Sequence, residues 1–333
     1  METATKSASK KLMSFRKTVI EDTSKDPKTA RNNQEKSPQK CGVVALMGLP
    51  NAGKSTLLNT LLDHPVAITS HTSGTTRFPL RGACVFENTQ LVLIDTPGLF
   101  EKARSTLEKA MLRAAEGAPI EADLWLLVID VTKGKKQLEH ILSHFSQKNR
   151  PPLWIVLNKI DQVQKPALLN WADTYQKVSD RLFMVSALEK DGTQDLLTAL
   201  LKAMPKGPWI FAQDVVTNID KSLMLAEMTR EALLHTLKEE VPHKLYVETE
   251  KIERAPRKTL KVNQVIHVSA ASHKSIILGK GGKTIKMLGQ QARRRMENFF
   301  QHPVHLFLYV RHTPLWMEKA SFYKMVGLEI TRK

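Results

Sequence analysis

Cysteine is almost absent from this 333-residue chain, which contains only Cys41 and Cys84. Two cysteines cannot form the disulfide framework of a small secreted scaffold, so a reducing compartment is indicated. The chain also has no stretch of about 18 apolar residues, and its longest apolar runs, such as LWLLVI, have the length of a strand. No Cys/His cluster has the spacing of a metal site, and His302 and His305 are interpreted as surface or groove residues. These absences predict a protein with no membrane-spanning helix, no disulfide framework and no zinc site.

Charge is distributed unevenly along the chain. Residues 1–40 carry ten Lys and Arg against five Asp and Glu, residues 41–240 carry twenty-two of each, and residues 241–333 carry eighteen against six. The net charge of +17 is therefore concentrated at the two ends, with +12 in the last part. A neutral body with a strongly basic end indicates a polyanionic partner for that end. The alternative is a solvated, Lys-rich surface that keeps the protein soluble.

Residues 1–40 are polar and poor in aromatic residues, which predicts a disordered basic tail. The first twenty residues partly fit a mitochondrial transit peptide, since Glu2 is their only acidic residue. Acidic residues at 21, 22, 26 and 35 break that pattern. The tail is therefore interpreted as a solvated segment of a cytoplasmic protein, with the mitochondrial matrix as the alternative location.

Two domains are predicted after the tail. From 41 to 204, short apolar runs such as VVALMG, LWLLVID and PLWIVLN alternate with helix-like stretches. This alternation predicts parallel strands with crossover helices, that is, a three-layer α/β domain. Two prolines and a glycine in PKGPWIFA place a linker at 205–216. Residues 217–333 follow as an α+β module with a connecting helix, three strand patterns, a glycine loop, a basic helix and a C-terminal tail.

The stretch GLPNAGKS at 48–55 matches G-x-x-x-x-G-K-[ST], directly after a predicted strand and at the start of a predicted helix. Gly48 and Gly53 allow tight turns that aim backbone N–H groups at phosphates. Lys54 adds a cation for the β- and γ-phosphates, and the Ser55 hydroxyl can ligate Mg²⁺. The pattern predicts a nucleoside triphosphate site.

Three further motifs follow in order, each after a strand. In DTPG at 95–98, Asp95 can hold the water shell of the metal, and Gly98 can offer its N–H to the γ-phosphate. In NKID at 158–161, the Asp161 carboxylate can accept two hydrogens from guanine, and adenine offers no such pair. SAL at 186–188 can bring a backbone N–H to the guanine O6. The predicted nucleotide contacts are Gly48, Leu49, Pro50, Asn51, Ala52, Gly53, Lys54, Ser55, Thr56, Asp95, Thr96, Pro97, Gly98, Asn158, Lys159, Asp161, Ser186, Ala187 and Leu188.

A second glycine loop, ILGKGGKTIK at 276–285, has Ile277 where a phosphate loop of the first kind would need glycine. Its G-x-x-G at 279–282, between an apolar run and a helix, is typical of a KH fold, whose loop clamps the backbone of about four nucleotides. Arginines 293–295 follow on the predicted helix, and HLFLYV could form an apolar groove wall. The predicted RNA contacts are Gly279, Lys280, Gly281, Gly282, Lys283, Lys286, Arg293 and Arg294. The alternative for the loop is a simple turn that begins a helix.

The order of these motifs, followed by a basic module with a G-x-x-G loop, resembles the Era family of GTPases over residues 41 to about 330. The stretch AEMTREALLHTLKEEVPHKLYVETEKIE is also similar to that family. The resemblance implies a P-loop GTPase domain followed by a type II KH domain, an enzyme that converts GTP and water to GDP and phosphate, and Mg²⁺ as cofactor.

The resemblance also assigns SGTTR at 73–77 to the first switch. Thr76 would then ligate Mg²⁺ with Ser55 and Asp95, and Thr75 is the alternative ligand. Most family members have Lys and Gln before TTR, where this chain has Ser73 and Gly74. The catalytic residues it implies are Lys54, Thr76 and Gly98.

The residue that follows DTPG is informative because Ras-like enzymes place a water-orienting Gln there. This chain has Leu99 and then Phe100, whose side chains form no hydrogen bond. Catalysis is therefore expected to depend on positioning by backbone groups and Mg²⁺. In similar GTPases the loop Asn, here Asn51, helps to hold a K⁺ ion; the alternative is a residue that only stabilises the turn.

The resemblance implies a target as well. Era-like proteins bind the 3′ end of small-subunit ribosomal RNA through the KH module and act in assembly of the small ribosomal subunit, here as an expected monomer. One alternative is a membrane-associated signalling GTPase whose basic end contacts anionic lipid. A cytoplasmic protein of this kind would be peripheral to the inner membrane. Another is a KH module that serves only to dock a protein partner.

Overall fold

The computed structural model of the chain describes residues 38–99, 103, 105–133, 150–175, 179, 181–237, 241–256 and 258–329. The predicted tail at 1–40 lies outside these residues except for its last three, and Phe100 also lies outside them. The chain divides into two compact units. The first comprises the described residues up to Ala67 and those within 79–99 and 115–218. The second comprises the described residues within 68–78 and 100–114 and those from Ile219 onward.

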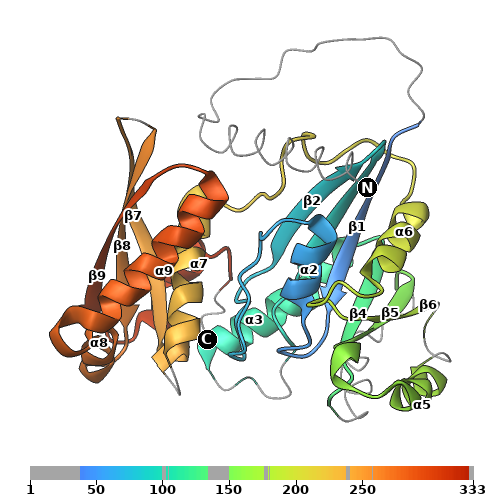
Figure 1. The fold of residues 1–333 in the computed structure, drawn as a ribbon, viewed down its shortest axis with the longest axis horizontal. Helices are drawn as coiled ribbons and strands as arrows, with labels where there is room; N and C mark the ends of the chain where they lie inside the picture. Colours follow the sequence, from blue (N-terminus) through green and yellow to red (C-terminus); the bar gives the residue numbers. More distant parts are fainter. Residues whose placement is uncertain are drawn as a thin grey trace. The chain divides into compact units, whose positions relative to one another are not determined.

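A six-stranded sheet forms the centre of the first unit (Figure 1). Its strands lie in the order β2-β3-β1-β4-β5-β6, all parallel except β2, which is antiparallel to β3. Every residue of β3, β4 and β5 is buried, which explains why these strands read as continuous apolar runs. The strands are β1 (Lys40–Met47), β2 (Leu80–Phe86), β3 (Thr89–Asp95), β4 (Leu124–Asp130), β5 (Leu153–Asn158) and β6 (Arg181–Val185).

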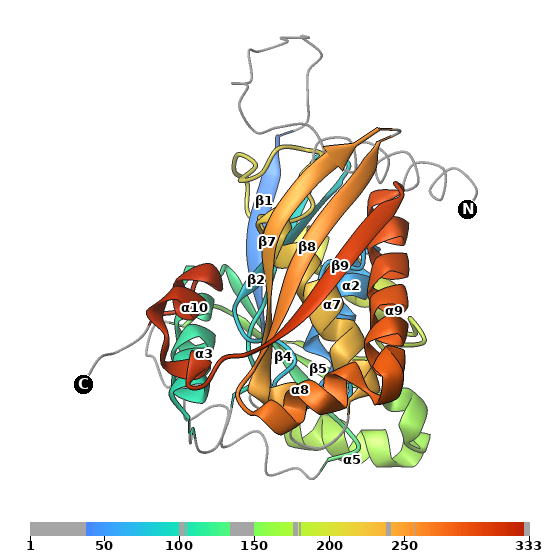
Figure 2. The same ribbon diagram turned by 90° about the vertical axis from the view of Figure 1, so that its left-hand side faces the viewer.

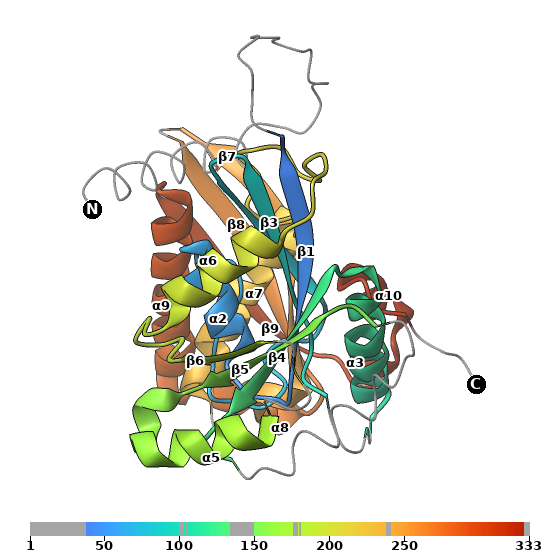
Figure 3. The same cartoon turned by 90° about the vertical axis from the view of Figure 1, so that its right-hand side faces the viewer.

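Among the described residues up to 203, the helices are α2 (Lys54–Leu62), α3 (Thr106–Gly117), α5 (Lys165–Tyr175) and α6 (Thr193–Ala203), with the short 3-10 helices η1 (Ala118–Glu121) and η2 (Ile160–Gln162). Helices α2 and α6 lie side by side against the sheet (Figure 3). Strand β1 has β3 on one side and β4 on the other. The loop after β1 therefore lies where the strand order reverses, the place where open α/β sheets bind ligands.

The predicted linker belongs to the first unit, and a buried amide is among the groups that hold it there. Gln90 in β3 is fully buried, and its Oε1 accepts hydrogen bonds from the backbone N–H groups of Ile210 and Phe211, both at 2.9 Å. Its Nε2 donates to the Phe211 carbonyl at 2.8 Å. The amide thus fastens the backbone at Ile210 and Phe211 to β3 by three hydrogen bonds.

The second unit contains a three-stranded sheet in the order β7-β8-β9, in which β7 and β8 are antiparallel and β8 and β9 parallel. Helices α7 and α9 pack together on one face of it (Figure 2). The parallel pair requires a crossover connection, which the helices between β8 and β9 supply. In chain order the elements are α7 (Lys221–Thr236), η3 (Val241–Lys244), β7 (Leu245–Ala255), β8 (Thr259–Val268), α8 (Ala271–Leu278), η4 (Lys280–Gly282), α9 (Lys283–Phe300), β9 (Val304–His312), η5 (Trp316–Glu318) and α10 (Ala320–Met325).

Local sequence explains the two long helices of this unit. Asp220 caps α7, since its side chain accepts hydrogen bonds from the N–H groups of Ser222 at 2.8 Å and Leu223 at 3.4 Å. Helix α9 buries a stripe with helical spacing, made of Leu288, Ala292, Met296, Phe299 and Phe300, and exposes basic residues elsewhere. Across the described residues, no helix combines the length and apolar character needed to cross a bilayer.

Segments from the middle of the sequence belong to the core of the second unit. Phe78 and, from α3, Leu107 and Met111 are buried in one aromatic cluster with Tyr246 and Trp316. The segment 68–78, which contains the predicted first switch at 73–77, is thus part of the same compact unit as the three-stranded sheet.

Candidate nucleotide-binding site and nucleic-acid interface

The loop between β1 and α2 requires glycine at both motif positions. Gly48 has φ 143° and Gly53 has φ 95°, values that L side chains rarely adopt. A Cβ on Gly48 would lie 2.4 Å from the Val128 carbonyl oxygen, and one on Gly53 would lie 2.2 Å from Nδ2 of Asn158. The backbone therefore passes so close to its neighbours that only glycine fits, as the motif predicted.

Lys54 is buried inside the loop that it follows. Its Nζ donates to the carbonyls of Gly48 at 3.1 Å and Leu49 at 3.0 Å. Burial lowers the pKa of the Lys54 ammonium to about 8, against the opposite effect of Asp95. Phosphate groups at this loop would stabilise the ammonium, because opposite charges favour the charged form.

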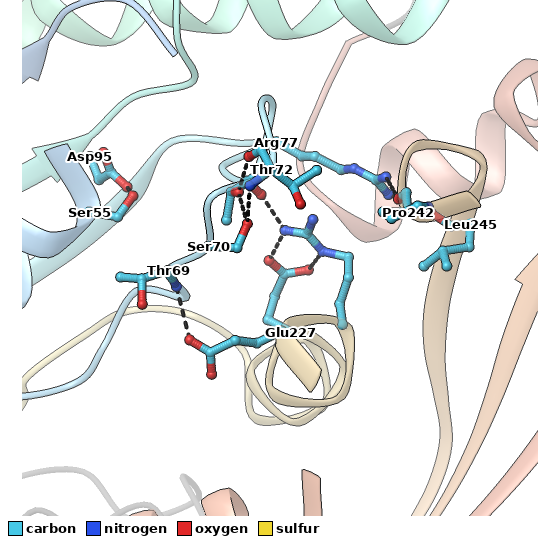
Figure 4. A network of polar contacts seen from close by, with 12 residues as sticks. Ser55, Thr69, Ser70, Thr72, Arg77, Asp95, Glu227, Pro242 and Leu245 are labelled. Atoms are coloured by element: carbon cyan, nitrogen blue, oxygen red, sulfur yellow. Dashed lines mark hydrogen bonds and ion pairs between the residues drawn. The ribbon is translucent and has the colours of Figure 1, made fainter. Parts of the chain in front are cut away.

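Ser55 and Asp95 are brought together from α2 and the end of β3. The Ser55 hydroxyl donates to Oδ2 of Asp95 at 2.5 Å, and Asp95 is fully buried (Figure 4). A hydroxyl and a carboxylate are hard oxygen ligands, the kind that Mg²⁺ prefers. The two residues therefore fit the ion that the sequence predicted here.

The loop after β3 lies directly against the phosphate loop. A Cβ on Gly98 would lie 2.6 Å from the backbone nitrogen of Pro50, so glycine is required for this approach. Leu99 donates its N–H to the Gly48 carbonyl at 3.2 Å, and its side chain is buried. The Thr96 hydroxyl donates to the Leu46 carbonyl at 2.7 Å, so it fastens the loop to β1.

Asn158 joins the base-reading loops to the phosphate loop. Its Nδ2 donates to the Ala52 carbonyl at 2.8 Å, and its Oδ1 accepts from the N–H of Ala187 at 3.0 Å. Because Asn158 is buried, both hydrogen bonds are shielded from water. One side chain thus fixes the relative positions of three predicted contact loops.

Asp130, at the end of β4, is a site residue that the motifs did not reveal. Its carboxylate pairs with Nζ of Lys159 at 2.6 Å and also accepts from Thr132. Burial opposes ionisation of Asp130, but the hydrogen bonds from Lys159 and Thr132 outweigh it and lower the pKa of this carboxyl below its ordinary value. The signal in the sequence was an acidic residue ending the apolar run LWLLVID.

The remaining predicted contacts lie on these loops as well. Asp161 is exposed on η2, Leu188 is exposed after β6, and Ser186 is buried, with its hydroxyl accepting from the N–H of Glu189 at 3.2 Å. The structure thus collects in the first unit all predicted nucleotide contacts except the switch threonine, namely residues 48–56, 95–98, 158, 159, 161 and 186–188.

Thr76 belongs to the second unit, in the segment 68–78. Its neighbour Thr75 is buried, and the Thr75 hydroxyl donates to the Thr72 carbonyl at 2.6 Å. The Ser70 and Thr75 hydroxyl oxygens also lie 2.6 Å apart, within hydrogen-bond distance. The role of Thr76 as a metal ligand, with Thr75 as the alternative, stays a prediction.

The G-x-x-G loop joins α8 to α9 through η4. Gly279, Gly281 and Gly282 have φ of 70°, 61° and 75°, and a Cβ on Gly279 would lie 2.1 Å from the Thr284 hydroxyl oxygen. Open space surrounds Gly281 and Gly282. The loop therefore presents its backbone to an incoming ligand, as the clamping of a nucleic-acid backbone requires.

Basic side chains surround this loop. Lys280, Lys283, Lys286, Arg293 and Arg294 are exposed, and Arg293 forms only a loose pair with Glu297 at 3.8 Å. Two apolar side chains that the motifs did not single out, Ile276 on α8 and Met287 on α9, are 49% and 42% exposed. Exposed apolar surface beside phosphate-binding cations is what a single-stranded nucleic acid needs for its bases and backbone.

Family models match both parts of the chain. A model described as 50S ribosome-binding GTPase matches residues 43–159, and a KH domain model matches residues 240–314. The predicted fold class, a P-loop GTPase domain followed by a KH domain, is confirmed by these matches.

Known relatives match the chain over nearly their full length. GTPase Era of Sinorhizobium medicae is 39% identical over 89% of this chain and 96% of its own, and GTPase Era of Rickettsia typhi is 41% identical over 87% and 98%. A solved structure of Era with MgGDPNP and nucleotides 1506–1542 of 16S ribosomal RNA has a TM-score of 0.82 at 33% identity, covering 87% of this chain and 99% of its own. Era of Aquifex aeolicus bound to GDP·AlF4⁻ has a TM-score of 0.81 at 32% identity over the same shares. With these identities over almost the whole of each relative, the chain belongs to the Era family of GTPases.

Proposed function

We propose that this protein is a GTP-hydrolysing switch that binds single-stranded RNA at the 3′ end of small-subunit ribosomal RNA and acts in assembly of the small ribosomal subunit. We place it, as a monomer, in the cytoplasm or in a mitochondrial matrix. The observation that carries the proposal is the similarity to the solved Era–RNA complex, which covers 87% of this chain. The two family models match stretches that contain the phosphate loop and the G-x-x-G loop. We propose residues 41–204 as the GTPase domain, 205–216 as the linker and 217–333 as the KH domain with its connecting helix.

The first-unit contacts support distinct roles in the hydrolysis of GTP. The backbone of the phosphate loop and the Lys54 ammonium would hold the β- and γ-phosphates. Ser55 and Asp95, with Thr76, would hold Mg²⁺, which supplies positive charge beside the phosphates. The Gly98 N–H would hydrogen-bond the γ-phosphate.

No water-orienting side chain follows Gly98, because the Leu99 side chain is apolar and buried. Backbone groups would therefore have to position the attacking water, while Asp161 selects guanine and Asn158 keeps the loops together.

Loss of Lys54 should abolish turnover. Lys54→Ala removes the phosphate-facing ammonium, and Ser55→Ala removes a metal ligand, so we expect GTP hydrolysis by either variant to fall at least about 100-fold. Leu99→Met keeps the volume of a buried side chain and should retain most of the parent rate. Phosphate release measured with saturating GTP and Mg²⁺ tests this. If Leu99→Met were as inactive as Lys54→Ala, the Leu99 side chain would have a catalytic role and positioning by backbone groups would be insufficient.

We also propose that Asn51 helps to hold a K⁺ ion near the transferring phosphate. Asn51 has φ 63° in the exposed part of the loop, a conformation in which Asn is tolerated better than most residues. Hydrolysis should then be several-fold faster in K⁺ than in Na⁺ at equal ionic strength, and Asn51→Ala should remove that difference. Equal rates of the parent protein in the two salts would leave Asn51 only its role in the turn.

A further inference from the structure

The segment 68–78, which we call the switch segment, is anchored to the second unit at one end by a buried arginine. Arg77 is 5% exposed, and its guanidinium donates to the Leu245 carbonyl at 2.8 Å and to the Pro242 carbonyl at 3.4 Å (Figure 4). The same group lies over the ring of Trp316, 5.8 Å from its centroid. Burial, with Arg230 nearby, lowers the pKa of Arg77 to about 9.

A second arginine, on α7, holds the middle of the switch segment. Arg230 is 1% exposed and is itself held by Glu227, through hydrogen bonds of 2.7 Å at Nε and 2.5 Å at Nη2. Nη2 also donates to the Thr75 carbonyl at 2.5 Å. Thr75, the residue before Thr76, is thus tied to helix α7.

The next residue of α7, Glu231, connects the switch segment to the helix that follows the G-x-x-G loop. Its Oε1 accepts from the Thr69 N–H at 2.9 Å, and its Oε2 pairs with Nε of Arg295 on α9. Glu231 is 5% exposed, so both partners satisfy one buried carboxylate. Arg295 directly follows the exposed Arg293 and Arg294, about three turns along α9 from the G-x-x-G loop.

A buried carboxylate with two partners makes the two bonds depend on one another. Loss of either partner leaves an under-compensated charge, which strengthens the hold on the other partner. The first switch of GTPases is ordered by the γ-phosphate and its metal and is released after hydrolysis, so the position of the Thr69 N–H is expected to depend on the nucleotide. RNA phosphates beside α9 would in turn attract Arg295.

We infer that Glu231 is a positioning residue that transmits the state of the switch segment to helix α9, and so couples bound nucleotide to RNA affinity through Thr69 and Arg295. The inference rests on the proposed function, because it needs both ligands. Such coupling is reciprocal: whatever factor the nucleotide applies to RNA affinity, RNA applies to nucleotide affinity.

The chain supplies a matched control for Glu231. Glu297 also pairs with an arginine of α9, Arg293, and its Oε1 also accepts a backbone N–H, that of Val304 at 3.1 Å. Glu231→Gln on α7 and Glu297→Gln on α9 therefore remove the same charge from a carboxylate that pairs with an arginine of α9, and both keep an acceptor for the backbone. Glu231 is the more buried of the two. Only Glu231 has a backbone partner in the switch segment.

The experiment measures the affinity of the full chain for RNA of nucleotides 1506–1542 of 16S ribosomal RNA, once with GDP and once with GDPNP, at fixed Mg²⁺ and salt. Coupling factors in allosteric proteins are about 5- to 150-fold, so the parent should show a ratio of at least about 5 between the two affinities. Glu231→Gln should bring that ratio to within about twofold of one, while its GDPNP affinity without RNA stays near that of the parent. Glu297→Gln should keep the parent ratio.

A second variant separates transmission from damage to the fold. Arg295→Gln removes the other side of the pair and leaves the Thr69 bond in place, and it should lower the ratio as Glu231→Gln does. The double variant should add no further loss, since both changes break one connection.

A parent ratio of one, or a ratio unchanged in Glu231→Gln, overturns the inference while the proposed function stands. Failure of the parent to bind this RNA with either nucleotide would instead overturn the proposed function, and the inference with it.

Discussion

Two acidic residues in the G-x-x-G loop, introduced as Lys280→Asp with Gly281→Asp, should reduce RNA affinity by at least about 100-fold. Roughly tenfold comes from the charge-assisted hydrogen bond that is lost, and the rest from repulsion between the new carboxylates and the RNA phosphates. The change removes a phosphate-facing cation and places two negative charges against the RNA backbone. Most of the salt dependence of binding should disappear with it, because fewer counterions are displaced. Open space around Gly281, and the tolerance of Asp for positive φ, make the variant compatible with the folded loop.

Nucleotide affinity provides the internal reference for this variant. None of the predicted nucleotide contacts lies in the loop, so GTP affinity and the basal hydrolysis rate should stay at parent values. Any stimulation of hydrolysis by RNA should be lost together with the binding. Titrations with labelled RNA at several salt concentrations, alongside GTP binding and phosphate release, measure all of these quantities.

A variant with the same change in net charge serves as the control. Lys319→Asp with Ser321→Asp alters exposed residues at the start of α10, in the same unit but outside the loop. It should lose much less RNA affinity, since only the long-range field changes. If the loop variant bound RNA like the parent at matched salt, the loop would not be the clamp. The basic surface or the N-terminal tail would then carry RNA binding, and contact with anionic lipid would become the stronger alternative.

Asp161→Asn should change the base that the GTPase domain prefers. The Asp161 carboxylate, exposed on η2, is predicted to accept hydrogens from N1 and the 2-amino group of guanine. In the variant one acceptor remains and an amide N–H faces the 2-amino donor, so GTP affinity should fall by at least about 1.5–3 kcal/mol, the value of one hydrogen bond to a charged group. Xanthosine triphosphate has a carbonyl at that position and should bind the variant better than it binds the parent.

Competition between GTP and xanthosine triphosphate for the same site measures this exchange of specificity. Asp195→Asn makes the same chemical change at an exposed acid on α6 and should leave the preference for GTP unchanged. Unaltered GTP binding by Asp161→Asn would mean that another group reads the base, and the assignment of the NKID motif to guanine would be wrong.

Short-range patterns were sufficient to predict much of this protein. Each phosphate-binding element is a strand, a tight turn and a helix, and all of its geometric requirements are met within a few residues. Gly48, Gly53 and the glycines at 279, 281 and 282 have a positive φ that most side chains rarely adopt, so their spacing alone identified both loops. The buried central strands could also be predicted from the sequence, because a parallel sheet that is covered on both faces needs continuous apolar runs.

The pairs of polar groups that organise the sites could not be predicted in this way. Asp130 pairs with Lys159, Asn158 bonds to Ala52 and Ala187, and Glu231 bonds to Thr69 and Arg295. These partners lie 29 to 162 residues apart. Their contact depends on which strand ends meet and which helix faces are buried, and the sequence pattern does not specify either.

Burial gives these distant pairs their importance. A charge removed from water needs a partner, and only the folded chain determines which partner is within reach. The amino-acid sequence by itself thus determined that the chain has one loop for a nucleotide and another for a nucleic acid. The tertiary structure decided that the switch segment belongs to the compact unit of the second loop, where the buried Glu231 bonds to both Thr69 and Arg295.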